Sequence, residues 1–223
     1  MSWLMAALYD RAMHGVEEAS LIRWRTDLLR DLSGDVLEVG AGTGANLPLY
    51  PSAVRRLVLV EPDPHMRRRL RHRHPAGAPA LEIRPERLET LDLPPASFDA
   101  VVATLVFCSV PDQAAALGHV RELLRPGGRL VFLEHVAADR DPQAQKWQRR
   151  LDPVWWRVAG GCRLTRRTEE AIREAGFTIE RIEREPMGKA PRVVRATIRG
   201  IAKKPSAATG PAPATRAVEG DQQ

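Results

Sequence analysis

The chain has 223 residues and a formal net charge of +6, with 43% hydrophobic and 28% charged residues. This length fits one large domain or a domain with a lid, and the composition excludes a largely disordered, collagen-like or disulfide-scaffold chain. The positive charge favours anionic partners, but acidic residues are interspersed throughout and few aromatic residues lie near the densest basic run, so we do not expect nucleic-acid binding.

The two cysteines, Cys108 and Cys162, are too few for a disulfide framework and lack the paired spacing of a structural zinc site. We therefore expect a protein of the reducing cytoplasm without a bound metal. The apolar stretch at the N-terminus is short and has no basic segment before it, so it predicts neither a signal peptide nor a membrane span.

The first part of the chain predicts a βαβ unit. Residues 3–30 carry apolar side chains among charges, which indicates one or two amphipathic helices. Residues 36–39 form a short apolar strand that ends in a glycine-rich turn, and residues 57–60 form another that ends at Glu61. We expect a helix between these two strands.

Strands and helices continue to alternate further along. The apolar run near residue 100 is nearly continuous, which is typical of a strand covered by helices on both faces. The predicted helices are 64–73 and 112–124, and the predicted strands are 81–83, 100–107 and 130–134. The pattern predicts an α/β fold with a Rossmann-like, doubly wound, mainly parallel sheet of seven strands.

The C-terminal part predicts a lid and two last strands. Residues 141–175 are helical in pattern and hold three of the five tryptophans. Residues 178–182 and 193–202 predict an antiparallel pair of strands. We expect a single domain over 1–204, made of N-terminal helices (1–33), a cofactor-binding core (34–135), a helical lid (136–175) and C-terminal strands (176–204), followed by a disordered tail (205–223).

The glycine-rich turn is the strongest functional signal. In VLEVGAGTGANLPLY, a strand runs into Gly40, Gly42 and Gly44, where the backbone can turn sharply and let a ligand approach. Glu61 lies about 20 residues after Gly40 at the next strand end, where a carboxylate can bind both hydroxyls of a ribose. These features predict a ligand that contains a nucleoside.

The glycine spacing does not choose between cofactors, because Gly40, Gly42 and Ala45 also satisfy the dinucleotide-binding pattern. Glu38 favours S-adenosylmethionine over NAD, since a carboxylate suits a ligand with ammonium and sulfonium charges and fits poorly beside a pyrophosphate. An NAD-dependent oxidoreductase, a non-catalytic cofactor-binding module and a Glu38 that is only a solvated edge residue remain the alternatives.

Longer segments carry a family resemblance. VLEVGAGTGANLPLY, LVLVEPD, LPPASFDAVVATLVFCSV and LLRPGGRLVFLEHV resemble class I S-adenosylmethionine-dependent methyltransferases, including the ubiquinone and menaquinone methyltransferase-like group. EHVAAD followed by WQRRLDPVWWRVAGGCRLTRRTEEAIREAGF is similar to the alkyl-thiol methyltransferase-like proteins of animals. LEVGAGTGANLPLY also resembles bacterial phospholipid N-methyltransferases.

This resemblance implies roles for individual residues. Those at the methionyl end of the cofactor are Glu38, Gly40, Ala41, Gly42 and Gly44; Glu61 binds the ribose; Pro62, Asp63 and Met66 flank the adenine; Thr104 and Leu105 line the sulfonium and donor methyl; and Tyr9 closes over the cofactor.

Two departures from the family pattern alter these expectations. Arg87 stands where relatives often carry an aspartate that binds the adenine amine, so this contact is expected to shift to Glu86 or to the backbone of Leu88. The animal relatives begin with a hydrophobic anchor that is not found in this sequence, which implies a soluble or peripheral enzyme.

The reaction requires little from the protein beyond alignment. Methyl transfer from a sulfonium is an in-line displacement, and a thiol acceptor is partly ionised at neutral pH, whereas an ammonium acceptor needs a base. His135 and Asp152 are the candidate bases, although His135 alternatively makes a hydrogen bond that fixes the lid. Cys162 either faces the acceptor or packs as an inert side chain, and Cys108 is expected to pack.

We expect a small, fairly apolar acceptor, with a thiol first and a phospholipid amine or a quinone-like ring as alternatives. The tryptophans of the lid either close an acceptor pocket or pack the lid on the sheet. Arginines beside them suit an anionic lipid surface, which leaves peripheral membrane contact open. The sequence makes no prediction of oligomeric state.

Overall fold

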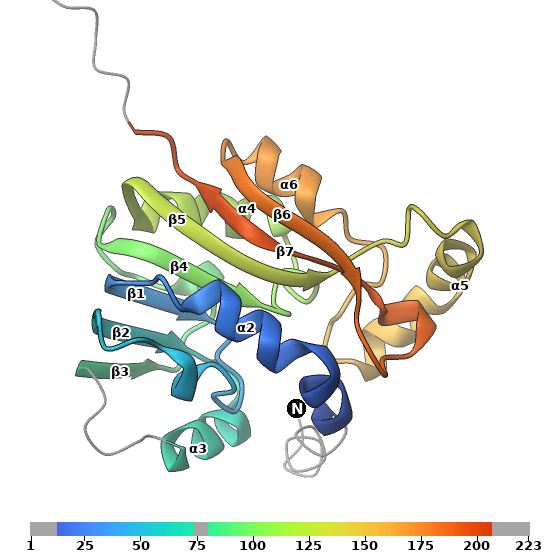
Figure 1. The fold of residues 1–223 in the computed structure, drawn as a ribbon, viewed down its shortest axis with the longest axis horizontal. Helices are drawn as coiled ribbons and strands as arrows, with labels where there is room; N and C mark the ends of the chain where they lie inside the picture. The colour runs from blue at the N-terminus through green and yellow to red at the C-terminus, as the bar shows by residue number, and fades with distance from the viewer. Residues whose placement is uncertain (1–12, 74–79, 207–223) are drawn as a thin grey trace, which may run out of the picture.

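The computed structural model describes residues 13–73 and 80–206. One mixed sheet runs through the described chain in the order β3-β2-β1-β4-β5-β7-β6 (Figure 1). The strands are β1 (Gly34–Val39), β2 (Val54–Val60), β3 (Ala80–Arg84), β4 (Phe98–Thr104), β5 (Leu124–His135), β6 (Thr178–Pro186) and β7 (Ala196–Lys203). The first five pair in parallel, and β7 is antiparallel to both β5 and β6. The predicted fold class is confirmed.

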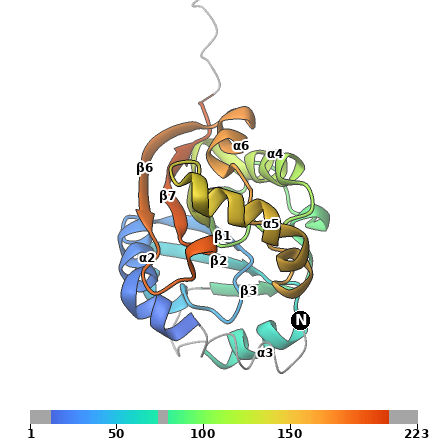
Figure 2. The same ribbon diagram turned by 90° about the vertical axis from the view of Figure 1, so that its right-hand side faces the viewer.

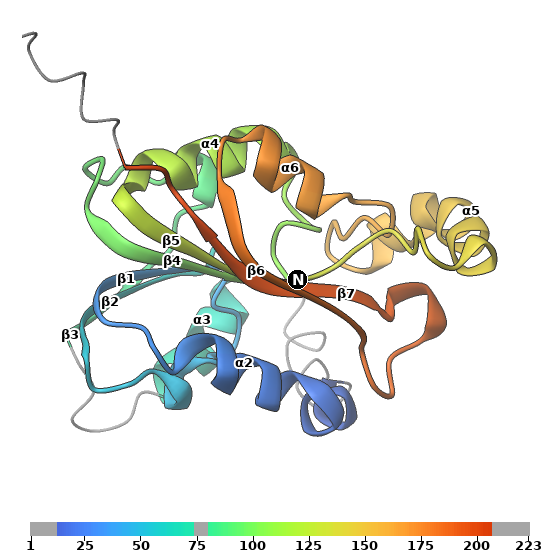
Figure 3. The ribbon, with the colours of Figure 1, turned by 45° about the horizontal axis from the view of Figure 1, so that its top comes forward.

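Helices cover both faces of this sheet (Figure 3). The α-helices are α2 (Ile22–Leu29), α3 (Pro64–His72), α4 (Gln113–Leu123), α5 (Pro142–Val158) and α6 (Thr168–Glu174), and a π-helical turn (Glu17–Leu21) leads into α2. Short 3₁₀ turns span Leu47–Leu49, Leu88–Thr90 and Arg192–Val194. The helices α2 and α3 lie on one face, and α4 and α6 lie on the other.

The hydrophobic core therefore has two halves. Val36 belongs to the cluster on the α2 side, whereas Leu37, the next residue of β1, belongs to the cluster on the α4 side. Successive side chains of a strand point to opposite faces, so both must be apolar when both faces are covered. This explains why the parallel strands read as continuous apolar runs.

The sequence prediction was wrong between β1 and β2, where the structure has turns and the short Leu47–Leu49 segment instead of an α-helix. Gly42 and Gly44 adopt positive φ angles of 58° and 86°, which interrupt a right-handed helix. Pro48 and Pro51 remove further amide donors. β4 also ends at Thr104, earlier than predicted, because Leu105 adopts a φ of 60°.

The helix α5 lies beyond the carboxyl ends of the parallel strands, in the segment predicted to be a lid (Figures 1 and 3). Figure 2 views this end directly and shows α5 crossing in front of the sheet. The amide of Ala137 donates to the carbonyl of Arg166, which ties the start of this segment to its end.

Candidate functional site

The glycine-rich turn lies at the carboxyl end of β1, and its glycines differ in their surroundings. A Cβ on Gly40 would lie 2.5 Å from Cγ2 of Val106, so this glycine is required for packing. A Cβ on Gly42 would meet no described atom within 4 Å, although φ is 58°. Gly42 therefore borders open space that a ligand can enter. Ala41 and Gly44, on either side of Gly42, are buried.

Glu38 is buried at the end of β1, with 2% of its surface exposed. Its Oε1 accepts a hydrogen bond from Nδ2 of Asn46 at 2.9 Å, and its Oε2 accepts one from the hydroxyl of Tyr50 at 2.7 Å. Burial raises the pKa of Glu38 to about 7, although Tyr50, Arg25 and Asn46 each oppose the shift. The carboxyl group is thus poised to ionise when a cation arrives.

Arg25 lies on α2 and reaches the region of Glu38 from the face of the sheet that α2 covers. Its Nη1 donates to Oδ1 of Asn46 at 2.8 Å and to Oγ1 of Thr104 at 2.7 Å. The residues that the sequence analysis missed here are Arg25, Asn46 and Tyr50. The signal for Arg25 was available, because it lies four residues from both Leu21 and Leu29 and so shares the apolar face of its helix.

Glu61 joins two turns at the carboxyl end of β2. Its Oε2 accepts from the amide of Gly42, and its Oε1 accepts from the amide of Asp63, both at 2.8 Å. Burial raises the pKa of Glu61. Asp63 caps α3 by accepting from the amides of His65 and Met66. Met66 is buried against this turn and Pro62 is exposed beside it.

The segment after β3 contains the residues expected near the adenine. Arg84 donates from Nη2 to Oε1 of Glu86 at 2.5 Å, and this ion pair lowers the pKa of Glu86. Leu88 is buried at the start of its 3₁₀ turn, whereas Arg87 is exposed. Glu86 is therefore already engaged by a neighbouring side chain.

The loop after β4 is held by Glu134 of β5, which is fully buried. Its Oε1 accepts from the amides of Val106 at 2.9 Å and Phe107 at 3.0 Å. The amide of Leu105 donates to the carbonyl of Leu133 at 2.7 Å, which fixes its positive φ. These bonds hold Thr104 and Leu105 in place at the carboxyl end of β4. The sequence analysis gave Glu134 no role.

The two predicted bases have different surroundings. Nε2 of His135 lies 2.8 Å from Sγ of Cys162, and a hydrogen bond with Cys108, aided by His135, lowers the pKa of that Cys162 thiol. Asp152 of α5 accepts from Nη1 of Arg163 at 2.9 Å and from the amide of Leu164 at 2.6 Å. Both of its oxygens therefore hold the lid segment together. Tyr9 lies outside the described residues.

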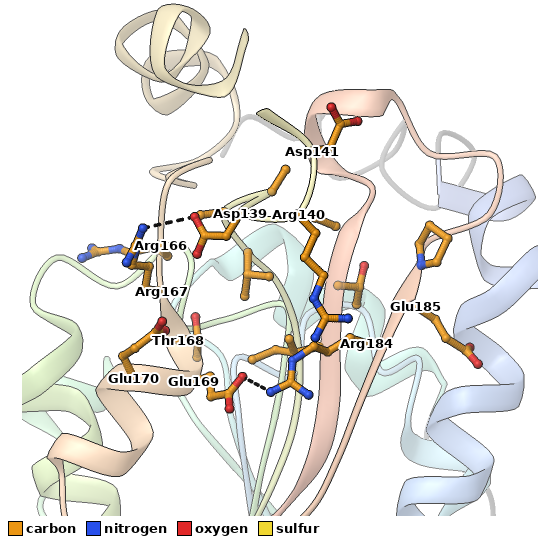
Figure 4. A pocket seen from close by; sticks show the side chains of 17 residues that line it. Asp139, Arg140, Asp141, Arg166, Arg167, Thr168, Glu169, Glu170, Arg184 and Glu185 are labelled. Carbon is orange, nitrogen blue, oxygen red and sulfur yellow. Dashed lines mark hydrogen bonds and ion pairs between the residues drawn. The ribbon is translucent and has the colours of Figure 1, made fainter. Parts of the chain in front are cut away.

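A separate cavity of about 260 Å³ lies between the end of β5, the start of α6 and the β6–β7 pair (Figure 4). The charges that line it are largely paired: Arg184 with Glu169, and Arg167 with Asp139 at 3.2 Å. Of the described residues that line this cavity, none is a predicted site residue.

Comparisons with known proteins agree with this geometry. The chain matches the methyltransferase domain family over residues 9–182. It is 35% identical over 194 residues to thiol S-methyltransferase TMT1B of Rattus norvegicus, covering 82% of this chain and 78% of the relative. It is 32% identical over 140 residues to phosphatidylethanolamine N-methyltransferase of Cereibacter sphaeroides, covering 62% and 68%. The solved S-adenosylmethionine-dependent methyltransferase of Mesorhizobium loti superposes with a TM-score of 0.63 at 20% identity, covering 85% and 100%.

The strand order, the glycine-rich turn and the carboxylates at the ends of β1 and β2 define a Rossmann-like enzyme that uses a nucleoside cofactor. The chain belongs to the methyltransferase domain family, and its cofactor is S-adenosylmethionine. The predicted activity and cofactor are confirmed.

Proposed function

We propose that the protein transfers the methyl group of S-adenosylmethionine to a small, fairly apolar thiol. The observation that carries this acceptor is the similarity to a thiol S-methyltransferase along 82% of the chain, at 35% identity. A thiol has a pKa of about 8.5 and is partly ionised at neutral pH, so it asks less of the protein than an ammonium group does.

The described residues fit the cofactor. Gly42 borders open space, and the buried Glu38 carboxyl would accept hydrogen bonds from the cofactor's ammonium group. Glu61 at the neighbouring strand end would bind the ribose hydroxyls, at the cost of rearranging its present bonds to amides. Around them, the residues proposed to complete the site are Gly40, Ala41, Gly44, Pro62, Asp63, Met66, Glu86, Leu88, Thr104, Leu105 and Tyr9.

The chain contributes to the reaction by alignment. The cofactor supplies an electrophilic methyl group, and an in-line displacement needs donor and acceptor to be held near contact distance with water excluded. The Arg25–Thr104 bond and the Glu134 bonds hold the carboxyl end of β4 and the loop after it, which would face the methyl group. Asp152 acts in this proposal as a positioning residue for the lid, because Arg163 and Leu164 engage its carboxylate.

The proposal is tested by measuring release of S-adenosylhomocysteine with matched acceptors. An alkyl thiol should support turnover, and the alkyl alcohol of the same length should not. Turnover with a phosphatidylethanolamine vesicle or a quinol, and none with any thiol, would overturn the thiol assignment. Gly42→Val provides the blank for uncatalysed release, since it blocks the proposed cofactor space.

Phospholipid amine methylation is the second candidate, and it is favoured by the bacterial relative and by the outer surface of α5. We propose that this surface contacts lipid. Its exposed apolar residues recur at helical spacing along one stripe, formed by Trp147, Leu151, Val154 and Val158. Arg150 lies 5.8 Å from the ring of Trp147, so the stripe also carries positive charge. No described helix is both long and apolar enough to cross a bilayer.

Sedimentation with vesicles tests the lipid contact. Vesicles that contain phosphatidylserine should carry the protein down more strongly than neutral phosphatidylcholine vesicles, because apolar burial and charge attraction act together. The double variant Trp147→Ser, Val154→Ser should lose this binding. Ile22→Ser is the matched control, since Ile22 is an exposed apolar residue on α2. Equal sedimentation of all three proteins would exclude α5 as the contact.

A further inference from the structure

Three potential metal ligands meet at the end of the sheet, outside the groups assigned to the cofactor. They are Cys108 in the loop after β4, His135 at the end of β5 and Cys162 after α5. The three ligand atoms all lie within 4.8 Å of one another. Because the three residues are far apart in the sequence, only the fold brings them together.

The backbone around this cluster is held in place. The amide of Cys108 donates to Oε2 of Glu134 at 3.4 Å, and its carbonyl accepts from the amide of Arg163 at 2.8 Å. These bonds tie the loop of Cys108 both to the strand of His135 and to the segment of Cys162. Such a frame pre-organises side chains for a shared ligand, since little ordering entropy remains to be lost on binding.

The His135 ring has an unusual environment for a buried polar group. It is 5% exposed, and its Nδ1 has no hydrogen-bond partner in the described part of the chain. Its Nε2 faces the Cys162 sulfur at 2.8 Å, and Trp155 donates from Nε1 to the same sulfur at 3.3 Å. Buried polar groups normally have conventional partners. An ion shared between Nε2 of the ring and the sulfurs would account for the close approach of these atoms, whereas Nδ1 takes no part in the proposed site.

We propose that Cys108, His135 and Cys162 bind one zinc ion through Sγ, Nε2 and Sγ. With Zn–S and Zn–N bonds of about 2.3 and 2.0 Å, tetrahedral geometry places neighbouring ligand atoms about 3.5–3.8 Å apart. The three ligand atoms lie within 4.8 Å of one another, so any pair needs to approach by about 1 Å at most, and the His135–Cys162 contact needs to widen by about 0.7 Å. Two thiolates and an imidazole favour zinc over magnesium or calcium, which prefer oxygen ligands.

Three protein ligands leave a fourth position open. Cys162 is the more exposed of the two cysteines, so we place the open position on the Cys162 side. This is the arrangement of catalytic zinc sites, which keep one position for water or substrate. Resting on the proposed function, the fourth ligand is the acceptor thiol, which displaces water, gives its proton to solvent and attacks the methyl carbon as the cofactor's sulfur leaves.

Zinc content tests the site without any turnover. The tag-free protein is loaded with zinc in a reducing buffer, dialysed and analysed by mass spectrometry. We expect one zinc per chain, and an affinity at least about tenfold lower in Cys108→Ser and in Cys162→Ser. His119→Gln is the control, because it removes a histidine outside the cluster. Circular dichroism verifies that each variant is folded. An unloaded native protein, or equal zinc in all variants, would overturn the proposal.

Cobalt substitution tests the ligand set itself. Cobalt(II) in the native site should give an intense thiolate-to-cobalt charge-transfer band and strong tetrahedral visible bands. The charge-transfer band should fall to about half in Cys108→Ser, since one thiolate of two is lost. Addition of a monothiol should strengthen it. Weak bands typical of octahedral cobalt would exclude the site. A tetrahedral cobalt spectrum that does not change on addition of the thiol would exclude the acceptor as the fourth ligand, and it would leave the proposed methyl transfer unaffected.

Discussion

Nη1 of Arg25 lies 2.7 Å from Oγ1 of Thr104, so a side chain of α2 is bonded to the last residue of β4. The same nitrogen holds Asn46, which in turn holds Glu38. One buried cation thus links α2 to the carboxyl ends of β1 and β4. In the proposed function, α2 therefore helps to hold the cofactor site in shape.

Arg25→Met should lower the free energy of unfolding by about 2–3 kcal/mol, because two bonds to a charged donor are lost and their buried acceptors are left without it. It should also weaken cofactor binding. Urea unfolding and calorimetric titration with S-adenosylmethionine measure the two effects. Arg23→Met, at an exposed position on the same helix, should change neither; equal effects of both variants would contradict the assigned network.

The affinity for S-adenosylmethionine should rise with pH through about 7. The buried Glu38 has a pKa of about 7, and only its ionised form attracts an ammonium group. Below that pH, the dissociation constant should increase by up to about tenfold per pH unit. Glu38→Gln should bind weakly at every pH with no such transition. A flat profile for the unmodified protein would exclude Glu38 as the titrating contact.

The same group should make the cofactor-free protein less stable as the pH rises. The pKa of Glu38 is raised on folding, so the stability it contributes is fully present below about 4.5 and is lost as the pH increases through about 7. Tyr50→Phe removes a hydrogen bond that favours the ionised form, so it should move the upper end of this loss to higher pH. Thermal unfolding across this pH range, without cofactor, measures the shift.

Gly42→Val should abolish cofactor binding while leaving a folded protein. The added side chain would enter open space, and the positive φ costs about 1–2 kcal/mol, which a stable domain tolerates. Circular dichroism and titration with the cofactor separate the two outcomes. Gly118→Ala is a matched control, because a Cβ there also meets no described atom within 4 Å but lies on α4. It should bind normally and be slightly more stable.

Glu134→Gln should destabilise the protein by about 1–3 kcal/mol. The remaining amide oxygen is a weaker acceptor for the amides of Val106 and Phe107 than a carboxylate is, and the new NH2 group faces the amide of Cys108. Urea unfolding measures the loss. Glu122→Gln, on the exposed side of α4, should have no measurable effect. If the free energy of unfolding is the same in Glu134→Gln as in the unmodified protein, the loop after β4 is held by other contacts.

Periodic patterns predicted the sheet well, because a parallel strand covered on both faces must be apolar throughout. Residues 100–107 show the limit of such reasoning: the apolar run continues past Thr104, but the positive φ of Leu105 ends the strand. The helix predicted between β1 and β2 is absent for a related reason. Apolar spacing alone does not reveal turns that glycines and prolines impose on it.

The sequence pointed to Glu38 and Glu61 through their distance from the glycines, but it did not reveal the side chains and amides that bond to them. Arg25 and Thr104 are bonded although they are far apart in the sequence, and no local motif encodes that pairing. The Cys108, His135 and Cys162 cluster is a sharper case. Its members lack the short spacing by which zinc ligands are recognised in sequences, so no sequence pattern could bring these three residues together.

The position of β7 has a consequence for how the molecule is made. β7 comes last among the described strands, yet it lies between β5 and β6 and supplies the sheet's only contact to β6. Until β7 leaves the ribosome, both β5 and β6 present unpaired edges, which are templates for aggregation. β6 can therefore join the sheet only once β7 has formed, and a chain that stops short of β7 exposes two strand edges to aggregation.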